Sequence, residues 1–448
     1  MMIPFVGVLL AAGQGKRMKS EMPKVLHEVA GKPIIDHALD AMRRAGATRI
    51  IVVVGHAGDA LAAHIGDAAE VVWQHEQLGT GHATMQALPA LEGFDGPVVV
   101  AAGDVPTLRA STLAGLVEKQ TSGGYSAAVL TMVLDDPAQY GRIVRSVNGD
   151  LKAITEYRDA SDEVRAVREV NTSVYSFNCA DLRAELPNIS NRNDQREYYL
   201  TDVIAALVAH GKRVRAVVLN DATEGFGINS REELAQAGKV LRERKSVELM
   251  ESGVTIVDPS NTYIDMDVEI GPDSIIEPFT VLSGRTVIGS RCHVGPYVCV
   301  RDGKMGNDCN IGPFSFIRPG TELADKVKVG DFVEVKNSKV GKGTKIPHLS
   351  YVGDADLGSG INIGAGTITC NYDGERKYRT TIEDGAFVGA NSNLVAPVTV
   401  SRDAYIATGS TITANIPAGA LGIARARQEN KEGWVERRRQ ARASKEDN

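Results

Sequence analysis

Residues 264–300 read IDMDVEIGPDSIIEPFTVLSGRTVIGSRCHVGPYVCV, and an aliphatic side chain occupies every sixth position of this stretch. The same spacing continues from Met305 to Val335 and again from Ile382 to Ile412. An amphipathic helix repeats every ~3.6 residues and a strand alternates its sides, so neither explains this period. A solenoid of short strands and tight turns does explain it.

The anchors of these runs would point inward and stack on their counterparts one coil away. Gly follows many of them, as in Ile270-Gly271 and Val329-Gly330, because glycine permits turn backbones that a Cβ would obstruct. An irregular β-domain could imitate one such run by chance, but three successive runs argue against that. We therefore predict a parallel β-helix of hexapeptide repeats in the C-terminal half.

The composition is that of a globular protein with more than one domain. The chain has 448 residues, of which 24% are charged and 43% hydrophobic, and its net charge is −6. A single core rarely grows to this length, so we expect at least two domains. The acidic balance gives no reason to expect nucleic-acid binding, and no apolar run reaches the length that membrane insertion requires.

Cysteine usage bears on the cellular compartment. The five cysteines are odd in number and form no CxxC pair, so neither a disulfide framework nor a zinc site is expected. The first residues also lack the basic and apolar regions of a secretory signal. We expect a cytoplasmic protein with reduced thiols.

Before residue 230, short apolar runs alternate with helical patterns. The expected strands are 6–10, 50–54, 71–74, 98–101 and 127–133, and the expected helices include 34–45 and 111–120. This alternation predicts a mostly parallel, Rossmann-like sheet with helices on both faces and ligands at the carboxyl ends of its strands. Residues 230–252 resemble a capped connecting helix that begins with Ser230 and two glutamates. The predicted domains are therefore 1–229, a helical linker at 230–252, and the β-helix with its C-terminal tail at 253–448.

The end of the first expected strand carries the sequence LLAAGQGKRM at 9–18. Its small residues allow successive backbone N–H groups to converge on an anion, and Arg17 and Lys24 can neutralise phosphate. The spacing matches neither the Walker motif nor the dinucleotide fingerprint. A Gly13-x-Gly15 pair alone is more often a plain tight turn, but two cations in register favour a phosphate-binding loop.

The expected strand at 98–101 ends in Ala102-Gly103-Asp104. An Asp in this place is either a turn-capping residue or a magnesium ligand. Taken alone, the two interpretations are about equally supported. A phosphate loop at the same edge of the sheet favours Mg²⁺.

Several motifs together resemble a known family. The N-terminal ones are the 10–18 loop, QHEQLGTGHA at 74–83, the Gly103-Asp104 turn, YGRI at 140–143, Glu156, Asn171-Thr172 and GIN at 227–229. The C-terminal ones are PHLSYVGD at 347–354 and NIGAGTITCNYDG at 362–374. The first set resembles the sugar-1-phosphate nucleotidyltransferases. The combination resembles the bacterial bifunctional N-acetylglucosamine-1-phosphate uridyltransferase/glucosamine-1-phosphate acetyltransferase family over nearly the whole chain.

The resemblance implies two reactions. Glucosamine 1-phosphate is acetylated by acetyl-CoA, and UMP is then transferred from UTP to give UDP-N-acetylglucosamine, a precursor of peptidoglycan and lipopolysaccharide. It also implies a left-handed β-helix, a homotrimer assembled through that β-helix, and Mg²⁺ for uridyl transfer.

For uridyl transfer, the resemblance implies catalytic roles for Arg17 and Lys24, which would hold the triphosphate. Asp104 and Asn229 would bind Mg²⁺. The residues implied to bind the nucleotide or the sugar are Leu10, Ala11, Ala12, Gly13, Lys24, Gln74, Gly79, Thr80, Gly141, Glu156, Asn171 and Asn229. Ala102 departs from the family, where a relative has Tyr before Gly-Asp.

For acetyl transfer, the resemblance makes His348 the general base. A lone His is more often structural, but a neutral imidazole could accept the proton lost when an amine attacks a thioester. The implied sugar-phosphate residues are Arg318, Lys336, Tyr351, Asn362 and Lys377, and the implied acetyl-CoA residues are Ala365, Asn371, Tyr372, Ala390, Thr408 and Arg425. Ala390 and Thr408 stand where a relative has Ser and Ala.

Three other functions are compatible with parts of this pattern. A nucleotidyltransferase that makes an ADP- or GDP-sugar could carry a β-helix but would not need His348. An enzyme with acetyltransferase activity alone would leave Asp104 without a role, and a non-catalytic assembly subunit would need neither residue.

Overall fold

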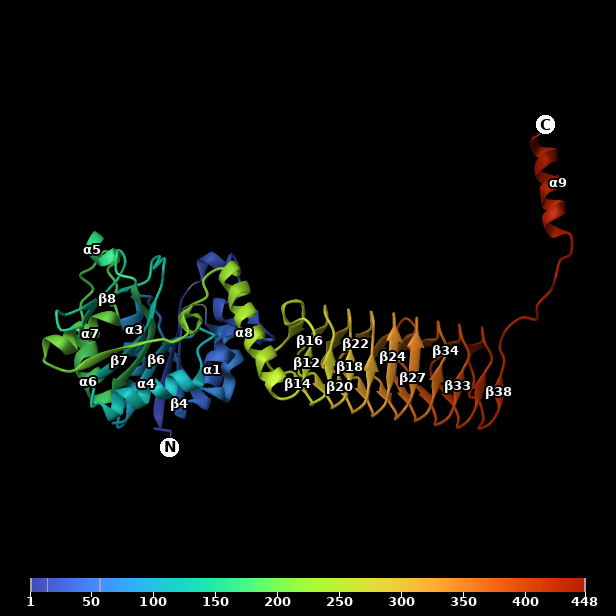
Figure 1. The fold of residues 1–448 in the computed structure, drawn as a ribbon, viewed down its shortest axis with the longest axis horizontal. Helices are drawn as coiled ribbons and strands as arrows, with labels where there is room; N and C mark the ends of the chain where they lie inside the picture. Colours follow the sequence, from blue (N-terminus) through green and yellow to red (C-terminus); the bar gives the residue numbers. More distant parts are fainter. Residues whose placement is uncertain (1, 14, 56–57, 447–448) are drawn as a thin grey trace. The chain divides into compact units, whose positions relative to one another are not determined.

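The computed structural model describes residues 2–13, 15–55 and 58–446. The chain divides into two compact units, Met1–Lys245 and Ser246–Asn448 (Figure 1). Among the described residues, no helix is both long and apolar enough to cross a membrane.

The first unit contains an open, mostly parallel sheet with the strand order β11-β7-β10-β6-β1-β4-β5. Its strands are β1 (Phe5–Ala11), β4 (Ala47–Val54), β5 (Glu70–Trp73), β6 (Pro97–Ala102), β7 (Ala127–Val133), β10 (Glu169–Asn178) and β11 (Val214–Val218). The short strands β8 (Arg142–Arg145) and β9 (Leu151–Thr155) extend it beside β10. The helices are α1 (Ile34–Arg44), α2 (Asp59–Ile65), α3 (Thr80–Ala87), α4 (Ala110–Ser122), α5 (Asp162–Arg165), α6 (Cys179–Glu185) and α7 (Thr201–Ala209).

Both faces of this sheet are covered, as the apolar strands predict. Along β4, Val52 and Val54 belong to one buried cluster, whereas Ile51 and Val53 belong to another on the opposite face. Successive side chains of a strand point to opposite faces, so a strand that is apolar throughout must be buried on both sides.

The sequence did not predict strand β10. It runs antiparallel between β6 and β7 and inserts into an otherwise parallel order. Its sequence, EVNTSVYSFN, mixes polar and apolar residues without strict alternation, so periodicity could not identify it. This strand brings Asn171 to the ligand edge of the sheet.

Helix α8 spans Arg231–Glu251 and starts one residue after the expected position. Its start is a capping box, because Ser230 Oγ accepts from the Glu233 N–H at 3.2 Å and Glu233 Oε2 accepts from the Ser230 N–H at 2.9 Å. Glu233 Oε2 also accepts from the Asn229 N–H at 2.6 Å. The cap therefore fixes the backbone of Asn229.

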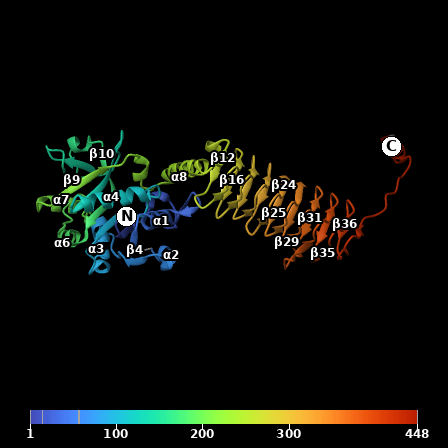
Figure 2. The ribbon, with the colours of Figure 1, turned by 60° about the horizontal axis from the view of Figure 1, so that its bottom comes forward.

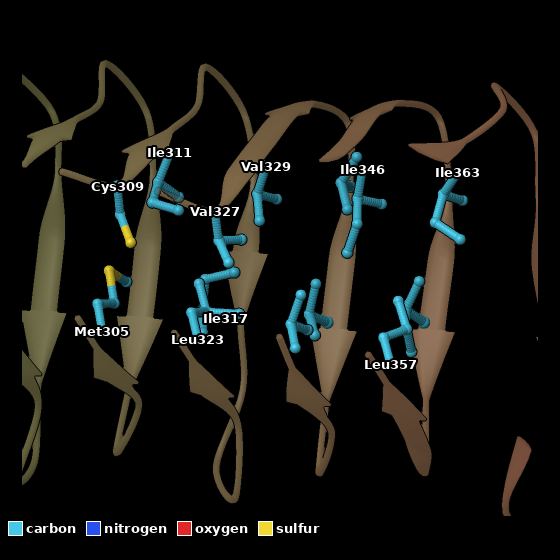
Figure 3. Close-up of a cluster of buried hydrophobic side chains, with 14 of the residues drawn as sticks. Met305, Cys309, Ile311, Ile317, Leu323, Val327, Val329, Ile346, Leu357 and Ile363 are labelled. Carbon is cyan, nitrogen blue, oxygen red and sulfur yellow. The ribbon is translucent and has the colours of Figure 1, made fainter. Parts of the chain in front are cut away.

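The second unit is the parallel β-helix that the hexads predict (Figures 1 and 2). Its first sheet runs from β12 (Thr255–Ile256) to β38 (Leu421–Gly422), its second from β13 (Tyr263–Ile264) to β37 (Thr411–Ile412), and its third from β14 (Glu269–Ile270) to β35 (Val398–Val400). Each strand pairs in parallel with the strand one coil away, as Ile276 does with Val294. The anchors are buried inside the coils, and Figure 3 shows Ile311, Val329, Ile346 and Ile363 stacked in this way.

We call the turns between the first and second sheets the first corner, those between the second and third sheets the second corner, and those that return to the first sheet the third corner. At the first corner Phe279, Tyr297, Phe314 and Phe332 form a ladder of stacked rings, with centroid separations of 4.8, 5.0 and 5.2 Å. All four have positive φ, between 54° and 60°. Their side chains remain about half exposed.

Beyond the last coil, the tail includes the exposed helix α9 (Trp434–Glu446). The sequence predicts only a partly ordered extension there, because the periodicity of the coils ends before it.

Candidate active sites

The first unit contains a cavity of about 770 Å³ at the carboxyl ends of β1 and β6. Its lining includes most of the residues singled out for the nucleotide, sugar and metal, namely Leu10, Ala11, Ala12, Gly13, Lys24, Gln74, Gly79, Thr80, Asp104, Glu156, Asn171 and Asn229. Gly141 lies just outside this lining, and a Cβ added to it would come within 3.3 Å of Glu156 Oε2. Arg17 is exposed in the short helix Lys16–Met18, and it is not part of the lining.

The end of β1 and the loop after it are held by the backbone of Gly103 and by the side chain of Gln77. Leu10 accepts from the Gly103 N–H at 2.9 Å, and Ala12 accepts from Gln77 Nε2 at 2.6 Å. A Cβ added to Gly13 would meet nothing within 4 Å, so the space beside it is open. This open space leaves the backbone of Gly13 accessible to a ligand in the cavity.

Gln74 follows β5 and is almost fully buried. Its Nε2 donates to Gly79 O at 3.1 Å and lies 3.0 Å from His82 Nδ1. Gly79 has a φ of 103°, and helix α3 begins directly after it. The amide of Gln74 is thus held in one orientation, as discrimination among bases by hydrogen bonds requires.

Lys24, Asp104 and Asn229 meet at one point of the cavity. Lys24 Nζ donates to Asp104 Oδ2 and, at 3.0 Å, to Asn229 Oδ1. Asp104 O also accepts from the Ile228 N–H at 2.9 Å, which ties the two segments together. The two side-chain oxygens already converge on a cation.

This geometry fits a magnesium ion. Mg²⁺ needs only one or two protein oxygens when phosphates and waters complete its shell. No group of three or more His, Cys, Asp or Glu that could hold a metal occurs among the described residues. Asp104 and Asn229 are the two side chains that could supply such oxygens here.

Glu156 and Asn171 also line the cavity. Burial raises the pKa of Glu156, its hydrogen bond from Thr201 Oγ1 at 3.2 Å lowers it, and the nearby Asp202 raises it further. Asn171 Nδ2 donates to Tyr175 Oη at 2.7 Å, and burial raises the pKa of Tyr175 as well. Asn171 and Thr201 are uncharged donors, and Glu156 is a buried carboxyl group with a raised pKa. Such groups suit the hydroxyl and amide groups of a sugar.

Arg142 begins β8 and braces the loop before it. It is 2% exposed, and its guanidinium donates to the carbonyl oxygens of Pro137, Ala138, Tyr140 and Arg165. Sequence reasoning included it in the YGRI motif without a role. Its contacts show that it fixes the loop that carries Gly141.

In the second unit, His348 ends strand β27 (Lys345–His348) at the first corner. It pairs in register with Asp331, the last residue of β24 (Lys328–Asp331), and its Nδ1 lies 2.5 Å from Asp331 Oδ1. The His348 side chain is 57% exposed. Its other ring nitrogen can therefore be reached from solvent.

The first corner continues beyond His348 with small residues. Ala365, Ala390 and Thr408 occupy it in the following coils, linked by the Asn391 N–H to Ala365 O at 2.7 Å and the Gly409 N–H to Ala390 O at 2.8 Å. Arg425 approaches the same corner, with its Cδ 4.0 Å from a Cβ built on Gly409. In the coils beyond His348, the first corner therefore carries small side chains at these positions.

Cationic side chains gather around the second corner. Lys336 ends β25 (Glu334–Lys336), and the ammonium group of Lys377 beside it is the main reason that its pKa is lowered, with burial and Arg318 contributing. Arg318 Nη1 donates to Glu334 Oε1 at 2.6 Å. Three cationic side chains gathered in this way attract an anion, and an anion would relieve the repulsion that lowers the pKa of Lys336.

The remaining residues predicted for acetyl transfer lie on β28, on β30 and in the loop after β31. Tyr351 begins β28 (Tyr351–Gly353), with its hydroxyl 3.5 Å from Asn371 Nδ2, and Asn371 also donates to the buried Asp354 at 2.5 Å. Asn362 begins β30 (Asn362–Ile363) and pairs with Lys345 of β27. Tyr372 is exposed in the loop after β31 (Ile368–Cys370), where its hydroxyl donates to Gly374 O.

Sequence reasoning assigned no role to Asp331 and Gln77. Asp331 precedes His348 by one coil, so the coil spacing, applied backwards from His348, could have found it. Gln77 lies in the motif at 74–83, but no local spacing indicates that it reaches Ala12.

Comparison with known proteins finds a transferase family in each of the two units. The MobA-like NTP transferase domain matches residues 7–171, the bacterial transferase hexapeptide matches 267–302, and the hexapeptide repeat of succinyl-transferase matches 379–414. The chain therefore joins a nucleotidyltransferase domain to a hexapeptide-repeat transferase domain.

The whole chain also has full-length relatives. It is 47% identical to the bifunctional protein GlmU of Geobacillus sp. strain WCH70, over 97% of this chain and 98% of that one. It is 49% identical to the GlmU of Heliobacterium modesticaldum, over 96% and 98% of the two chains. The chain belongs to the GlmU family of bifunctional proteins, and it is an enzyme with two transferase sites.

Proposed function

We propose that the enzyme first acetylates glucosamine 1-phosphate with acetyl-CoA in the β-helix and then transfers UMP from UTP to the product in the first unit. The single observation that carries this proposal is the presence of two separate sites on one chain. One is a cavity in which a carboxylate and an amide oxygen converge on a cation, and the other is a coil region with an exposed His at the first corner and a cluster of cationic side chains at the second corner.

In uridyl transfer, the phosphate of N-acetylglucosamine 1-phosphate attacks the α-phosphorus of UTP, a new P–O bond forms, and pyrophosphate leaves. The loop at 10–13 and Lys24 would hold the phosphates, and exposed Arg17 would approach them from outside the cavity. Asp104 and Asn229 would hold Mg²⁺, which neutralises charge on the phosphates when bound. No protein nucleophile is required, because positioning and charge neutralisation supply the catalysis.

In acetyl transfer, the amine of glucosamine 1-phosphate attacks the thioester carbonyl, and the CoA thiolate leaves. His348 would accept the proton that the amine loses. Arg318, Lys336 and Lys377 would hold the sugar phosphate, with Tyr351 and Asn362 beside the sugar. Acetyl-CoA would lie along the small residues of the first corner, where Arg425 suits a phosphate, with Asn371 and Tyr372 nearby.

We further propose that the enzyme works as a cytoplasmic homotrimer. The ring ladder supports assembly, because half-exposed aromatic stripes on soluble proteins mark interaction surfaces. The positions of the acetyltransferase residues support a shared site. His348 lies at the first corner and Lys336 at the second, so a neighbouring chain could bring two such corners together.

Separate assays of the two reactions test the proposal. We expect Asp104→Asn to reduce uridyl transfer strongly and to leave acetyl transfer nearly unchanged, because Asp104 and His348 lie in different units. We expect His348→Ala to lower acetyl-transfer turnover by about 10² to 10⁴-fold, the usual contribution of a general base, and to spare uridyl transfer.

Three other results of these assays would contradict the proposal or change it. Equal loss of both activities in Asp104→Asn would indicate misfolding, and full acetyl transfer in His348→Ala would show that another group is the base. An enzyme that prefers ATP or GTP to UTP would instead favour the ADP- or GDP-sugar alternative.

A further inference from the structure

We propose that Asp331 is a positioning residue for His348: its carboxylate holds the Nδ1 hydrogen of the imidazole, so that Nε2 faces the substrate as the proton acceptor. The inference rests on the proposed acetyl transfer and deepens it.

The coil geometry brings the two side chains together. Asp331 and His348 end the paired strands β24 and β27 and lie directly opposite each other. The Leu349 N–H donates to Asp331 O at 2.9 Å, and Ser350 Oγ donates to His348 O at 2.8 Å, so the backbone on both sides of the pair is fixed.

Gly330 sets how closely these coils approach. A Cβ at this position would lie 1.9 Å from Pro347 O, a distance that no side chain could occupy. Glycine therefore allows the two turns to pack at the separation that the Asp331–His348 hydrogen bond requires.

The corner sequence changes at this pair. The position equivalent to Asp331 is proline in the three preceding coils, as Pro278, Pro296 and Pro313. Proline cannot accept a hydrogen bond with its side chain. The corner therefore has a carboxylate one coil before His348, where it can accept a hydrogen bond from the imidazole.

The imidazole depends on this carboxylate for its orientation. With 57% of its side chain exposed, His348 is not held by packing, and Asp331 is the side chain that hydrogen-bonds it among the described residues. The other charged groups on the two strands are Lys328 and Lys345, which lie at the opposite end of each strand. On the neighbouring strands, β30 contributes the uncharged Asn362 and β28 contributes Tyr351.

The hydrogen bond selects one tautomer. A neutral imidazole carries a single N–H, and a carboxylate acceptor at Nδ1 places it there, leaving the lone pair on Nε2. When Nε2 takes the proton from the attacking amine, the same carboxylate stabilises the imidazolium that forms. The hydrogen bond with His348 is the main reason that the pKa of Asp331 is lowered. A lowered pKa keeps the carboxylate ionised, so Asp331 retains its negative charge.

A double-mutant cycle on the full-length enzyme separates positioning from a structural role. We expect Asp331→Asn to lower acetyl-transfer turnover about tenfold or more, within the range of coupling between contacting groups. The KM for glucosamine 1-phosphate should change little, because the cationic cluster lies at the second corner. In a His348→Ala background, Asp331→Asn should cause no further loss, and Asp331→Glu should retain more turnover than Asp331→Asn.

Asp308→Asn is the matched control. Asp308 pairs with Arg291 across neighbouring coils, with Arg291 Nε 2.8 Å from its Oδ1, and its loss should leave acetyl turnover unchanged. If Asp331→Asn keeps full turnover while His348→Ala loses it, the inference is wrong and the proposed function stands. The inference is also wrong if the loss is the same with and without His348, and full turnover in His348→Ala overturns both.

Discussion

At the scale of single residues, Glu156 shows how a candidate binding residue in the cavity can lower the stability of the fold. Burial raises its pKa, and the nearby Asp202, Asp159 and Glu197 add to that effect against one hydrogen bond from Thr201. An acid whose pKa is higher in the folded state binds more protons there than in the unfolded state, so stability falls as pH rises. The penalty is absent below the ordinary Glu pKa of about 4.3 and is complete once pH exceeds the raised value.

We therefore expect Glu156→Gln to raise the melting temperature of the substrate-free enzyme at pH 7. At a pH below about 4 the variant and the parent should melt together, because the carboxyl is then neutral in both states. Thermal melts of the two proteins across this range measure the difference.

Glu118→Gln serves as the control, since Glu118 is exposed on α4, and it should leave the melting temperature unchanged throughout. A melting temperature of Glu156→Gln that is lower than that of the parent at pH 7 would mean that the Thr201 hydrogen bond outweighs the cost of burial.

At the scale of elements, the sequence predicts what repeats and misses what depends on distant pairing. The hexads predict the coils because each anchor contributes its own signal, and Ile264, Ile276 and Val294 are fully buried as expected. Strand β10 was missed because its place between β6 and β7 depends on pairing far along the chain.

In the candidate sites too, residues with a local signal could be predicted, and contacts between distant segments could not. The loop at 10–13 and Asp104 could be predicted because each directly follows an apolar strand. Their convergence with Asn229 was predicted only through resemblance, because it depends on the capping of α8 and on the Ile228–Asp104 hydrogen bond, which no local pattern indicates. His348 was identified through resemblance, whereas its partner Asp331 lies one coil away, where only the register of the β-helix connects them.

The first corner as an element yields another prediction. If acetyl-CoA lies along its small residues, Ala390→Trp should fill the path of the ligand, because the backbone of Thr408 and Gly409 packs closely against this turn. We expect the KM for acetyl-CoA to rise about tenfold or more, equivalent to ~1.4 kcal/mol of lost binding. Steady-state kinetics with each substrate varied in turn would measure it.

Lys342→Trp places the same bulk at the third corner, where Lys342 is exposed between β26 (Lys339–Val340) and β27. It should leave the KM for acetyl-CoA unchanged. If both variants bind acetyl-CoA as the parent does, the ligand does not lie along the first corner.

At the scale of the whole molecule, the ring ladder decides whether one chain is sufficient. Four aromatic residues adopt left-handed backbone, which is strained for bulky side chains, yet Phe314 and Phe332 still leave 47% and 58% of their area exposed. A second copy of the chain could cover these rings and add a neighbouring β-helix beside His348. Charge placed on the ladder should then prevent assembly, because burying an unpaired carboxylate is costly.

We expect the double variant Phe314→Glu/Phe332→Glu to sediment as a monomer, to lose most acetyl transfer, and to retain uridyl transfer. Val287→Glu, which puts the same charge on an exposed strand of the third sheet, should remain assembled. Sedimentation equilibrium combined with the two separate assays measures all three effects. A parent enzyme that is fully active as a monomer would rule out the trimer, and a ladder variant that stays assembled would place the interface on another face. Loss of acetyl transfer without dissociation would mean instead that the ladder supports His348 within a single chain.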